Sequence, residues 1–159
     1  MGLEDNKVIV RQFIRTVWNE GNLHRIEDFI SPSYTIPGGG SGPTGVRENV
    51  QRFREAFPDI VVQISHTVAE GDLVVTWLNL EGTNCGPFKN YPPSHNRVKW
   101  WEVAFWWIQN GMIVRGQFAA NMLALRQGIG VFHHFHRNLG LVVLNNLQWP
   151  TPMEPQLSR

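Results

Sequence analysis

The chain has 159 residues, a net charge of +1 and a single cysteine, Cys85. This length suits one domain with its own core, and the balanced charge argues against nucleic acid or a membrane surface as a partner. One cysteine excludes an internal disulfide and a cysteine-based metal site. No apolar run approaches the ~18 residues of a membrane-spanning helix, and the polar first residues do not suit a signal peptide. We therefore expect a cytoplasmic protein.

Apolar residues recur at helical spacing in three N-terminal segments, residues 3–18, 22–30 and 45–57. Each segment ends at a helix-terminating signal, namely Gly21, Ser31-Pro32 and Pro58. Tyr34 falls between the second and third helices on a short extended segment. The glycine-rich residues 37–43 that follow can form only a loop.

From residue 59 the apolar period changes from 3.6 to 2, which predicts strands at about 60–68, 73–81, 98–108 and 112–121. Asn110-Gly111 joins the last two strands and is a strong hairpin signal, because both turn positions need φ > 0. Three helices followed by a meandering antiparallel sheet indicate an α+β fold. We expect a cone-shaped α+β barrel, with the N-terminal helices packed on a curved sheet around a cavity.

The sequence predicts one domain over residues 1–130 and a C-terminal extension over 131–159. In the extension we expect a helix around residues 132–145 and then a disordered end. His133, His134 and His136 cluster there, but no carboxylate accompanies them until Glu154, so we expect no metal site.

Glu102 is the main candidate for chemistry, because it lies in a strand among four tryptophans. By the strand period its side chain shares a face with Trp100, Ala104 and Trp106. Burial against indole rings raises the pKa of a carboxyl group, which suits a general acid or base near neutral pH. The alternative is an ion pair with a cation on the outer face of the sheet, from Arg97, Lys99 or Arg115.

His66 shares the more apolar face of its strand, so it is a candidate partner for Glu102; the alternative is a core histidine. Trp100, Trp106 and Phe118 are interpreted as pocket walls, whose indole faces favour a polycyclic or cationic guest. Asn121 ends the last strand, either as a pocket residue or as an amide that satisfies backbone groups. The opposite face carries three further tryptophans, which predict a homodimer through the outer sheet face: Trp77, Trp101 and Trp107.

Seven short motifs occur in a familiar order: VWNEGNL at 17–23, SPSY at 31–34, AFPD at 56–59, EGD at 70–72, GT at 82–83, PP at 92–93 and NG at 110–111. In order and spacing they resemble the SnoaL-like polyketide cyclase family, within the superfamily named after nuclear transport factor 2. The resemblance covers roughly residues 5–130. It implies an α+β cone open at one end, no cofactor, often a homodimer, and activity on or binding of small hydrophobic molecules.

This chain departs from the family pattern at the positions of the aldol-type cyclases. The aspartate that serves as acid/base corresponds to Phe118, a histidine to Ala104, a pocket asparagine to Ile36 and a pocket glutamine to Glu102. Apolar groups and one new carboxylate thus replace the aldol machinery. Tyr34, near the mouth in the family pattern, is a candidate donor to a carbonyl or epoxide oxygen.

The sequence therefore predicts a cofactor-free cyclase or isomerase of secondary metabolism. Its substrate would be a hydrophobic polyketide, terpenoid or meroterpenoid intermediate, with Glu102 moving protons in an aromatic pocket. A pericyclic or epoxide-opening ring closure is also compatible, because holding a flexible chain near its reactive shape contributes several kcal/mol. The alternative is a non-catalytic small-molecule-binding module, and burial of Glu102 without a cationic partner would discriminate between them.

Overall fold

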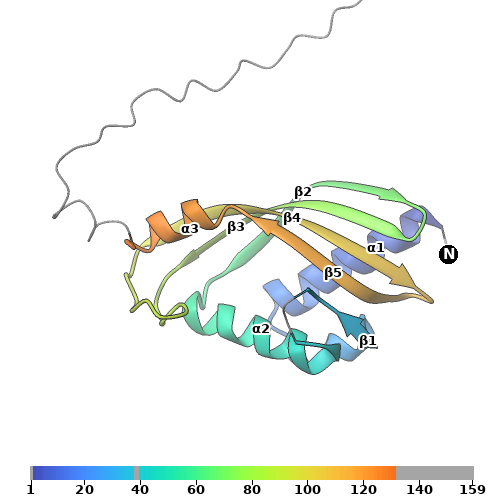
Figure 1. The fold of residues 1–159 in the computed structure, drawn as a ribbon, viewed down its shortest axis with the longest axis horizontal. Helices are drawn as coiled ribbons and strands as arrows, with labels where there is room; N and C mark the ends of the chain where they lie inside the picture. Colours follow the sequence, from blue (N-terminus) through green and yellow to red (C-terminus); the bar gives the residue numbers. More distant parts are fainter. Residues whose placement is uncertain (1, 38–39, 132–159) are drawn as a thin grey trace, which may run out of the picture.

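The computed structural model describes residues 2–37 and 40–131 and contains helices on one five-stranded curved sheet (Figure 1). The α-helices are α1 (Leu3–Phe13), α2 (Gly42–Ala56) and α3 (Met122–Gly128); a π-helical segment η1 (Ile14–Asn19) continues α1, and a 3₁₀ segment η2 (Leu23–Asp28) follows. The strands are β1 (Ile30–Thr35), β2 (Val61–Glu70), β3 (Leu73–Thr83), β4 (Arg97–Gln109) and β5 (Met112–Ala120). The predicted α+β fold is confirmed.

The sheet has the strand order β1-β5-β4-β3-β2, in which β1 runs parallel to β5 and the other neighbours are antiparallel. Helices α1 and α2 lie on the same side of this sheet, and the core fills the space between the two layers (Figure 1). Helix α3 covers the start of β4, where Gly128 lies against Val98, and its Leu125 is fully buried. Among residues 2–37 and 40–131, no helix covers most of the opposite face of the sheet (Figure 1).

The predicted hairpin at Asn110-Gly111 is present, since both residues have positive φ, 49° and 79°, and join β4 to β5. The first helical region ends at Gly21, also as predicted, with φ of 72°. The second helix is shorter than predicted and is 3₁₀. It stops before Ile30 because this residue already pairs with Ile113 of β5.

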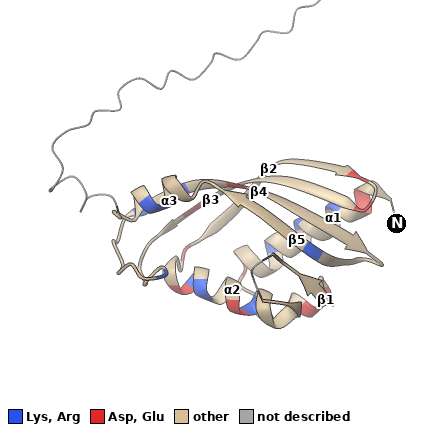
Figure 2. Ribbon diagram, in the orientation of Figure 1, with Lys and Arg blue, Asp and Glu red and all other residues tan. Residues whose placement is uncertain are grey.

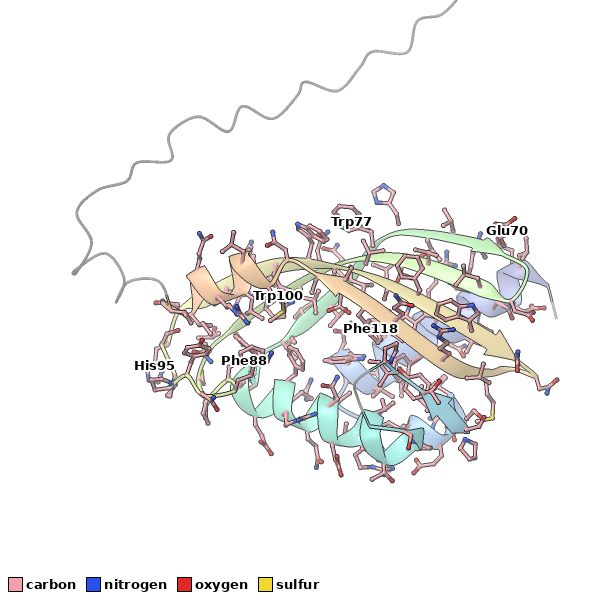
Figure 3. The ribbon with its side chains drawn as sticks, viewed as in Figure 1. Glu70, Trp77, Phe88, His95, Trp100 and Phe118 are labelled. Carbon is pink, nitrogen blue, oxygen red and sulfur yellow. The ribbon has the colours of Figure 1, made fainter. Side chains whose placement is uncertain are left out.

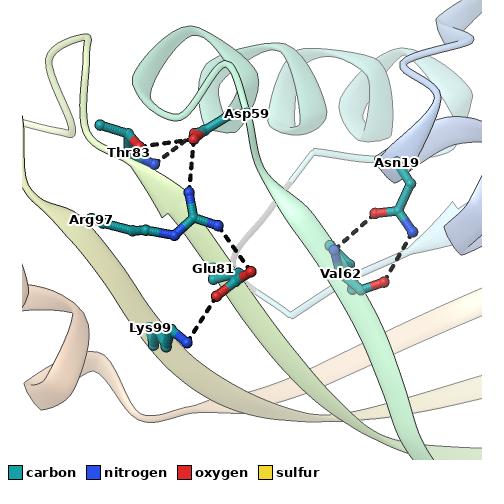
Figure 4. Close-up of polar contacts among 7 residues, drawn as sticks. All are labelled: Asn19, Asp59, Val62, Glu81, Thr83, Arg97 and Lys99. Carbon is teal, nitrogen blue, oxygen red and sulfur yellow. Dashed lines mark hydrogen bonds and ion pairs between the residues drawn. The ribbon is translucent and has the colours of Figure 1, made fainter.

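The start of the edge strand β2 is bound by a side chain from the helical layer. The Asn19 amide accepts a hydrogen bond from Val62 N at 2.8 Å and donates one to Val62 O at 3.0 Å (Figure 4). Asn19 lies at the end of η1, within the motif at 17–23. The motif therefore fastens the helices to the sheet.

Charged side chains on the outer part of the sheet form a ladder. Arg97 binds Asp59 at 3.1 Å and Glu81 at 2.9 Å, and Lys99 binds Glu81 at 3.1 Å (Figure 4). Helix α2 carries both arginine and glutamate residues (Figure 2). In the described residues, no helix is both long and apolar enough to cross a membrane.

The predicted orientation of His66 is wrong. Between Ile64 and His66 the pairing of β2 with β3 shifts by one residue, so that Ile64 is opposite Leu78 and His66 is opposite Trp77. This bulge at Ser65 reverses the two faces of the strand. His66 is therefore exposed on the outer face rather than directed to the cavity.

The predicted domain over residues 1–130 remains an expectation, and the helix expected at 132–145, the disordered end and the histidine cluster lie outside the described residues. Before them, residues 122–130 contain the expected helical turn, as α3.

Candidate active site

Two adjoining chambers lie between the helices and the concave face of the sheet. The Glu102 chamber measures about 180 Å³, and the Tyr34 chamber, lined by Tyr34 as well as Gly40 and Gly45, measures about 80 Å³. Both are lined by the same five residues, Trp18, Ile36, Asn49, Trp106 and Phe118. The shared lining, three of whose five residues are aromatic, indicates one continuous and mostly apolar site.

Glu102 is directed into its chamber by the register of the sheet. It lies opposite Leu78 of β3 and Ala120 of β5, on the same face as the buried Trp100 and Trp106. The rest of the chamber wall is apolar apart from Asn49, and comprises Ile14, Trp18, Ile36, Phe53, Val62, Leu78, Leu80, Trp106 and Phe118. The surroundings of the carboxyl group are thus mainly hydrocarbon and aromatic surface.

The three cations considered as partners for Glu102 are bound elsewhere. Arg97 and Lys99 belong to the ion-pair ladder, and Arg115 lies over the Trp107 ring at 4.5 Å from its centre. Within residues 2–37 and 40–131, Glu102 has neither an ion pair nor a side-chain hydrogen bond, and no fully buried polar side-chain atom lacks a partner. Its carboxyl oxygens therefore reach the open space of the chamber.

Burial raises the pKa of Glu102 from its usual 4.5 to about 7, and loss of hydration is the cause. A charged carboxylate is poorly solvated among apolar groups, so the neutral form is favoured. With a pKa of about 7, both the acid and the base form are well populated near neutral pH. Such a group suits proton transfer in either direction.

Tyr34 supplies a hydroxyl group to the second chamber. Its side chain is 3% exposed, and burial raises its pKa to about 12, so the hydroxyl stays protonated and able to donate. Gly116 on β5 makes room for it, because a Cβ atom there would collide with the Tyr34 hydroxyl oxygen. The missing side chain at Gly116 is thus a requirement of the site.

The indole of Trp106 forms a fixed wall of both chambers. Its Nε1 donates a hydrogen bond of 3.0 Å to the Thr76 hydroxyl, which is fully buried. The rings of Phe13 and Phe118 meet it edge-on, with centroid distances of 5.7 and 5.1 Å. Since its N–H is already used, Trp106 offers a guest its aromatic surface rather than a hydrogen bond.

The structure brings together some of the residues predicted for the site and separates others. Phe118 and Ile36 line both chambers together with Trp106. Trp100 lies on the helix side of the sheet, like Phe118, whereas Trp77 projects from the other side (Figure 3). Trp100 does not line either chamber, however, because it packs on Phe57 in the core, with ring centroids 5.4 Å apart.

Ala104 and Asn121 line neither chamber in the structure. Ala104 is fully buried opposite Thr76 and Phe118, where it packs in the sheet. The Asn121 side chain accepts a hydrogen bond from Ala124 N at 3.0 Å and caps α3, which is the backbone role considered as its alternative. Among the described residues, no group of three or more His, Cys, Asp or Glu side chains is placed to hold a metal ion.

Asn49 is a polar lining residue that the sequence analysis missed. It lies on α2, half-buried, and contributes to both chambers. The signal was present in the sequence, because Asn49 falls three residues after Val46 and four before Phe53, on the apolar stripe of its helix. A polar residue within such a stripe indicates either a buried hydrogen bond or a site.

Similar folds occur in several solved structures. TsrD from Streptomyces laurentii matches with a TM-score of 0.76 and 21% identity, over 82% of this chain and 98% of TsrD. A candidate polyketide cyclase from Acidithiobacillus ferrooxidans matches at 0.71 and 27%, over 81% and 97% of the two chains. AclR, a candidate hydroxylase from Streptomyces galilaeus, matches at 0.73 and 22%, over 82% and 98%. A comparison with curated proteins found no match.

The helices on a curved sheet, closed over an aromatic cavity, define an α+β cone of the nuclear transport factor 2 type. The family model described as SnoaL-like polyketide cyclase matches residues 8–129. This chain belongs to the SnoaL-like polyketide cyclase family.

Proposed function

We propose that the protein is a cofactor-free cyclase or isomerase that acts on a hydrophobic polyketide, terpenoid or meroterpenoid intermediate, with Glu102 as its acid/base. The observation that carries the proposal is a carboxyl group with a pKa of about 7 in an apolar chamber, with no ion-pair partner in the described part of the chain. A structural glutamate would gain more from an ion pair on the outer face, where its neighbours Arg97 and Lys99 lie.

In the proposed reaction the ionised Glu102 removes a proton from a substrate carbon next to a carbonyl group. The electron pair of the broken C–H bond enters a new carbon–carbon double bond, and the carbonyl oxygen gains negative charge. In an isomerisation, the electron pair of the enolate takes the proton back from Glu102 at another carbon. In a cyclisation, the enolate carbon attacks a second carbonyl group of the substrate, and the C=O π pair that is displaced onto oxygen takes the proton from Glu102. Because protons alone are exchanged with the protein, the sequence of steps balances without an oxidant or reductant.

The chamber walls would fold the substrate and exclude water. Trp106 and Phe118 present aromatic surface to both chambers, and the Tyr34 hydroxyl is a permanent donor at the far end. Displacement of water by an apolar guest strengthens the electrostatic interactions inside the site. The aromatic lining supports a flat or polycyclic substrate over a polar one.

The test measures exchange of the acidic C–H protons of 2-tetralone, a small bicyclic ketone, for deuterium in D₂O. We expect the wild-type protein to catalyse exchange and Glu102→Gln to lose about 10²-fold or more of that rate, because general acid–base catalysis contributes roughly 10²–10⁴-fold. Binding of the ketone should survive, since glutamine keeps the size of the side chain.

Glu70→Gln is the matched control, because Glu70 is exposed at the end of β2, away from both chambers. Exchange at the wild-type rate in Glu102→Gln would refute the acid/base role. Ketone binding without any exchange above buffer in the wild-type protein would favour the alternative, a non-catalytic small-molecule-binding module.

A further inference from the structure

We propose that the Asn49 carboxamide binds the substrate oxygen on which negative charge develops, so that Asn49 and Glu102 act as a pair across one chamber. The inference rests on the proposed function of Glu102 and adds a second substrate contact to it. It identifies the substrate as a compound with a carbonyl or similar acceptor oxygen close to the carbon that loses a proton.

The composition of the chamber is the first argument. Among the lining residues of the Glu102 chamber, Glu102 on β4 carries a carboxyl group and Asn49 on α2 carries a carboxamide group. The other lining residues are aliphatic or aromatic. Glu102 and Asn49 come from opposite layers, one from the sheet and one from the helix that covers it. A guest that fills this chamber can therefore reach both groups.

The absence of a protein partner is the second argument. In the part of the chain that the structure describes, no hydrogen bond joins the Asn49 side chain to another residue, and no fully buried polar side-chain atom is left unpaired. The carboxamide must then face open space, where water satisfies it in the free protein. An acceptor oxygen of a guest can replace that water without loss of a hydrogen bond.

The chemistry of the two groups is complementary. An ionised carboxylate only accepts hydrogen bonds, whereas a carboxamide NH₂ group has two donors. Glu102 is occupied with the proton of the substrate carbon, so the negative charge that develops on the substrate oxygen needs a separate donor, and the Asn49 N–H groups can stabilise it. Donors placed where charge develops in an apolar site are among the strongest contributions to catalysis.

Three other asparagines of the fold already bind protein groups, which sets Asn49 apart from them. Asn19 binds the backbone of Val62, Asn84 binds backbone groups of its loop, and Asn121 caps α3. Each of these amides thus has a structural role. Asn49 lies in the lining of both chambers without one.

A matched pair of probes tests the proposal, namely 2-tetralone and tetralin, which lacks the oxygen but has the same bicyclic frame. We expect Asn49→Ala and Asn49→Leu to weaken 2-tetralone binding by about 3- to 10-fold, the range for one hydrogen bond. Tetralin binding should stay within twofold of wild type in the leucine variant, which refills the space. Gln51→Ala, on the exposed side of α2, is the control.

NMR gives a second readout that a merely structural role would not move. The side-chain NH₂ resonances of Asn49, identified by their absence in Asn49→Ala, should move downfield with 2-tetralone and not with tetralin. Equal loss of affinity for both probes, no loss for either, or no binding of 2-tetralone to the wild-type protein would overturn the proposal.

The outcome is separable from that of the acid/base proposal. Exchange at the wild-type rate in Glu102→Gln would remove Glu102 as the acid/base, while the probe result for Asn49 still stood as binding. Conversely, Glu102→Gln could lose exchange while Asn49→Leu keeps the wild-type affinity for 2-tetralone. That result would support Glu102 as the acid/base and refute Asn49 as the group that binds the substrate oxygen.

Discussion

At the scale of single residues, burial of Glu102 couples the stability of the fold to pH. The folded state holds a proton with a pKa of about 7, whereas the usual value is 4.5. Between these values the folded protein binds more protons than the unfolded chain, so the free energy of unfolding falls as pH rises. Below pH ~4.5 the Glu102 carboxyl group is protonated in both the folded and the unfolded state, so burial of its charge no longer lowers the free energy of unfolding.

We therefore predict that Glu102→Gln raises the free energy of unfolding at pH 8, by on the order of 2 kcal/mol after allowance for partial exposure of the side chain. At pH 4.5 we expect no such gain in stability. Urea unfolding of both proteins at a series of pH values measures this difference, and other titrating groups cancel in the subtraction. A difference that does not vary with pH would show that Glu102 has an ordinary pKa.

Several residues show where inference from the sequence ends. The strand period placed Glu102, Trp106 and Phe118 on the inner face, because the ladder between β3, β4 and β5 is regular around them. The same counting failed for His66, since a bulge inserts one residue and no local signal marks Ser65 as its position. The two-residue alternation of a strand predicts which face a side chain occupies only as far as the strand pairing stays in register.

At the scale of elements, the loop between β3 and β4 is organised around Asn84, which is fully buried. Its amide donates to Gly86 O at 2.8 Å, and its carbonyl oxygen accepts from Ser94 N at 2.8 Å and from the Ser94 hydroxyl at 3.1 Å. The amide also donates to Ala56 O at 3.4 Å, where α2 ends. One side chain thus ties the two ends of the loop to α2.

We predict that Asn84→Ala lowers the free energy of unfolding by about 2–4 kcal/mol, because it leaves several buried polar groups without partners. Asn90→Ala, at an exposed position of the same loop, should change it by less than about 0.5 kcal/mol. Thermal or urea unfolding measures both. Equal stability of the two variants would mean that water replaces the Asn84 contacts.

The elements themselves were largely predictable, and the exceptions have physical reasons. The glycine and Asn-Gly signals fixed the ends of η1 and the β4–β5 hairpin through backbone conformation, which is local. The second helix was predicted too long because its expected last residue, Ile30, instead pairs with Ile113 of β5. This partner is more than eighty residues away in the sequence, so no local signal indicates it. Asn49 was missed because an apolar stripe is ordinarily interpreted as core.

At the scale of the whole molecule, the outer face of the sheet is the surface best suited to association. Trp77 and Trp101 are 42% and 37% exposed and stack on each other with centroids 5.1 Å apart. Val68, on the same face of β2, is 64% exposed. Contiguous apolar patches of this kind mark interaction sites on soluble proteins.

We propose that two copies pack through this face and predict that the protein is a dimer in solution. Trp77→Ser combined with Trp101→Ser should shift the equilibrium toward the monomer without loss of the fold, because neither side chain belongs to the core. Light scattering at micromolar concentration measures the mass. A wild-type species of 18 kDa alone would refute the dimer.

The two hydrogen bonds between Asn19 and Val62 affect which part of the sheet is open to a second copy (Figure 4). Strand β2 is an outermost strand of the sheet, and an exposed strand edge is a template for uncontrolled stacking of one chain on the next. At the start of β2 the amide of Asn19 already occupies the donor and acceptor that an intruding strand would need. This short side chain therefore blocks the addition of another strand at Val62, where the edge of the sheet meets η1.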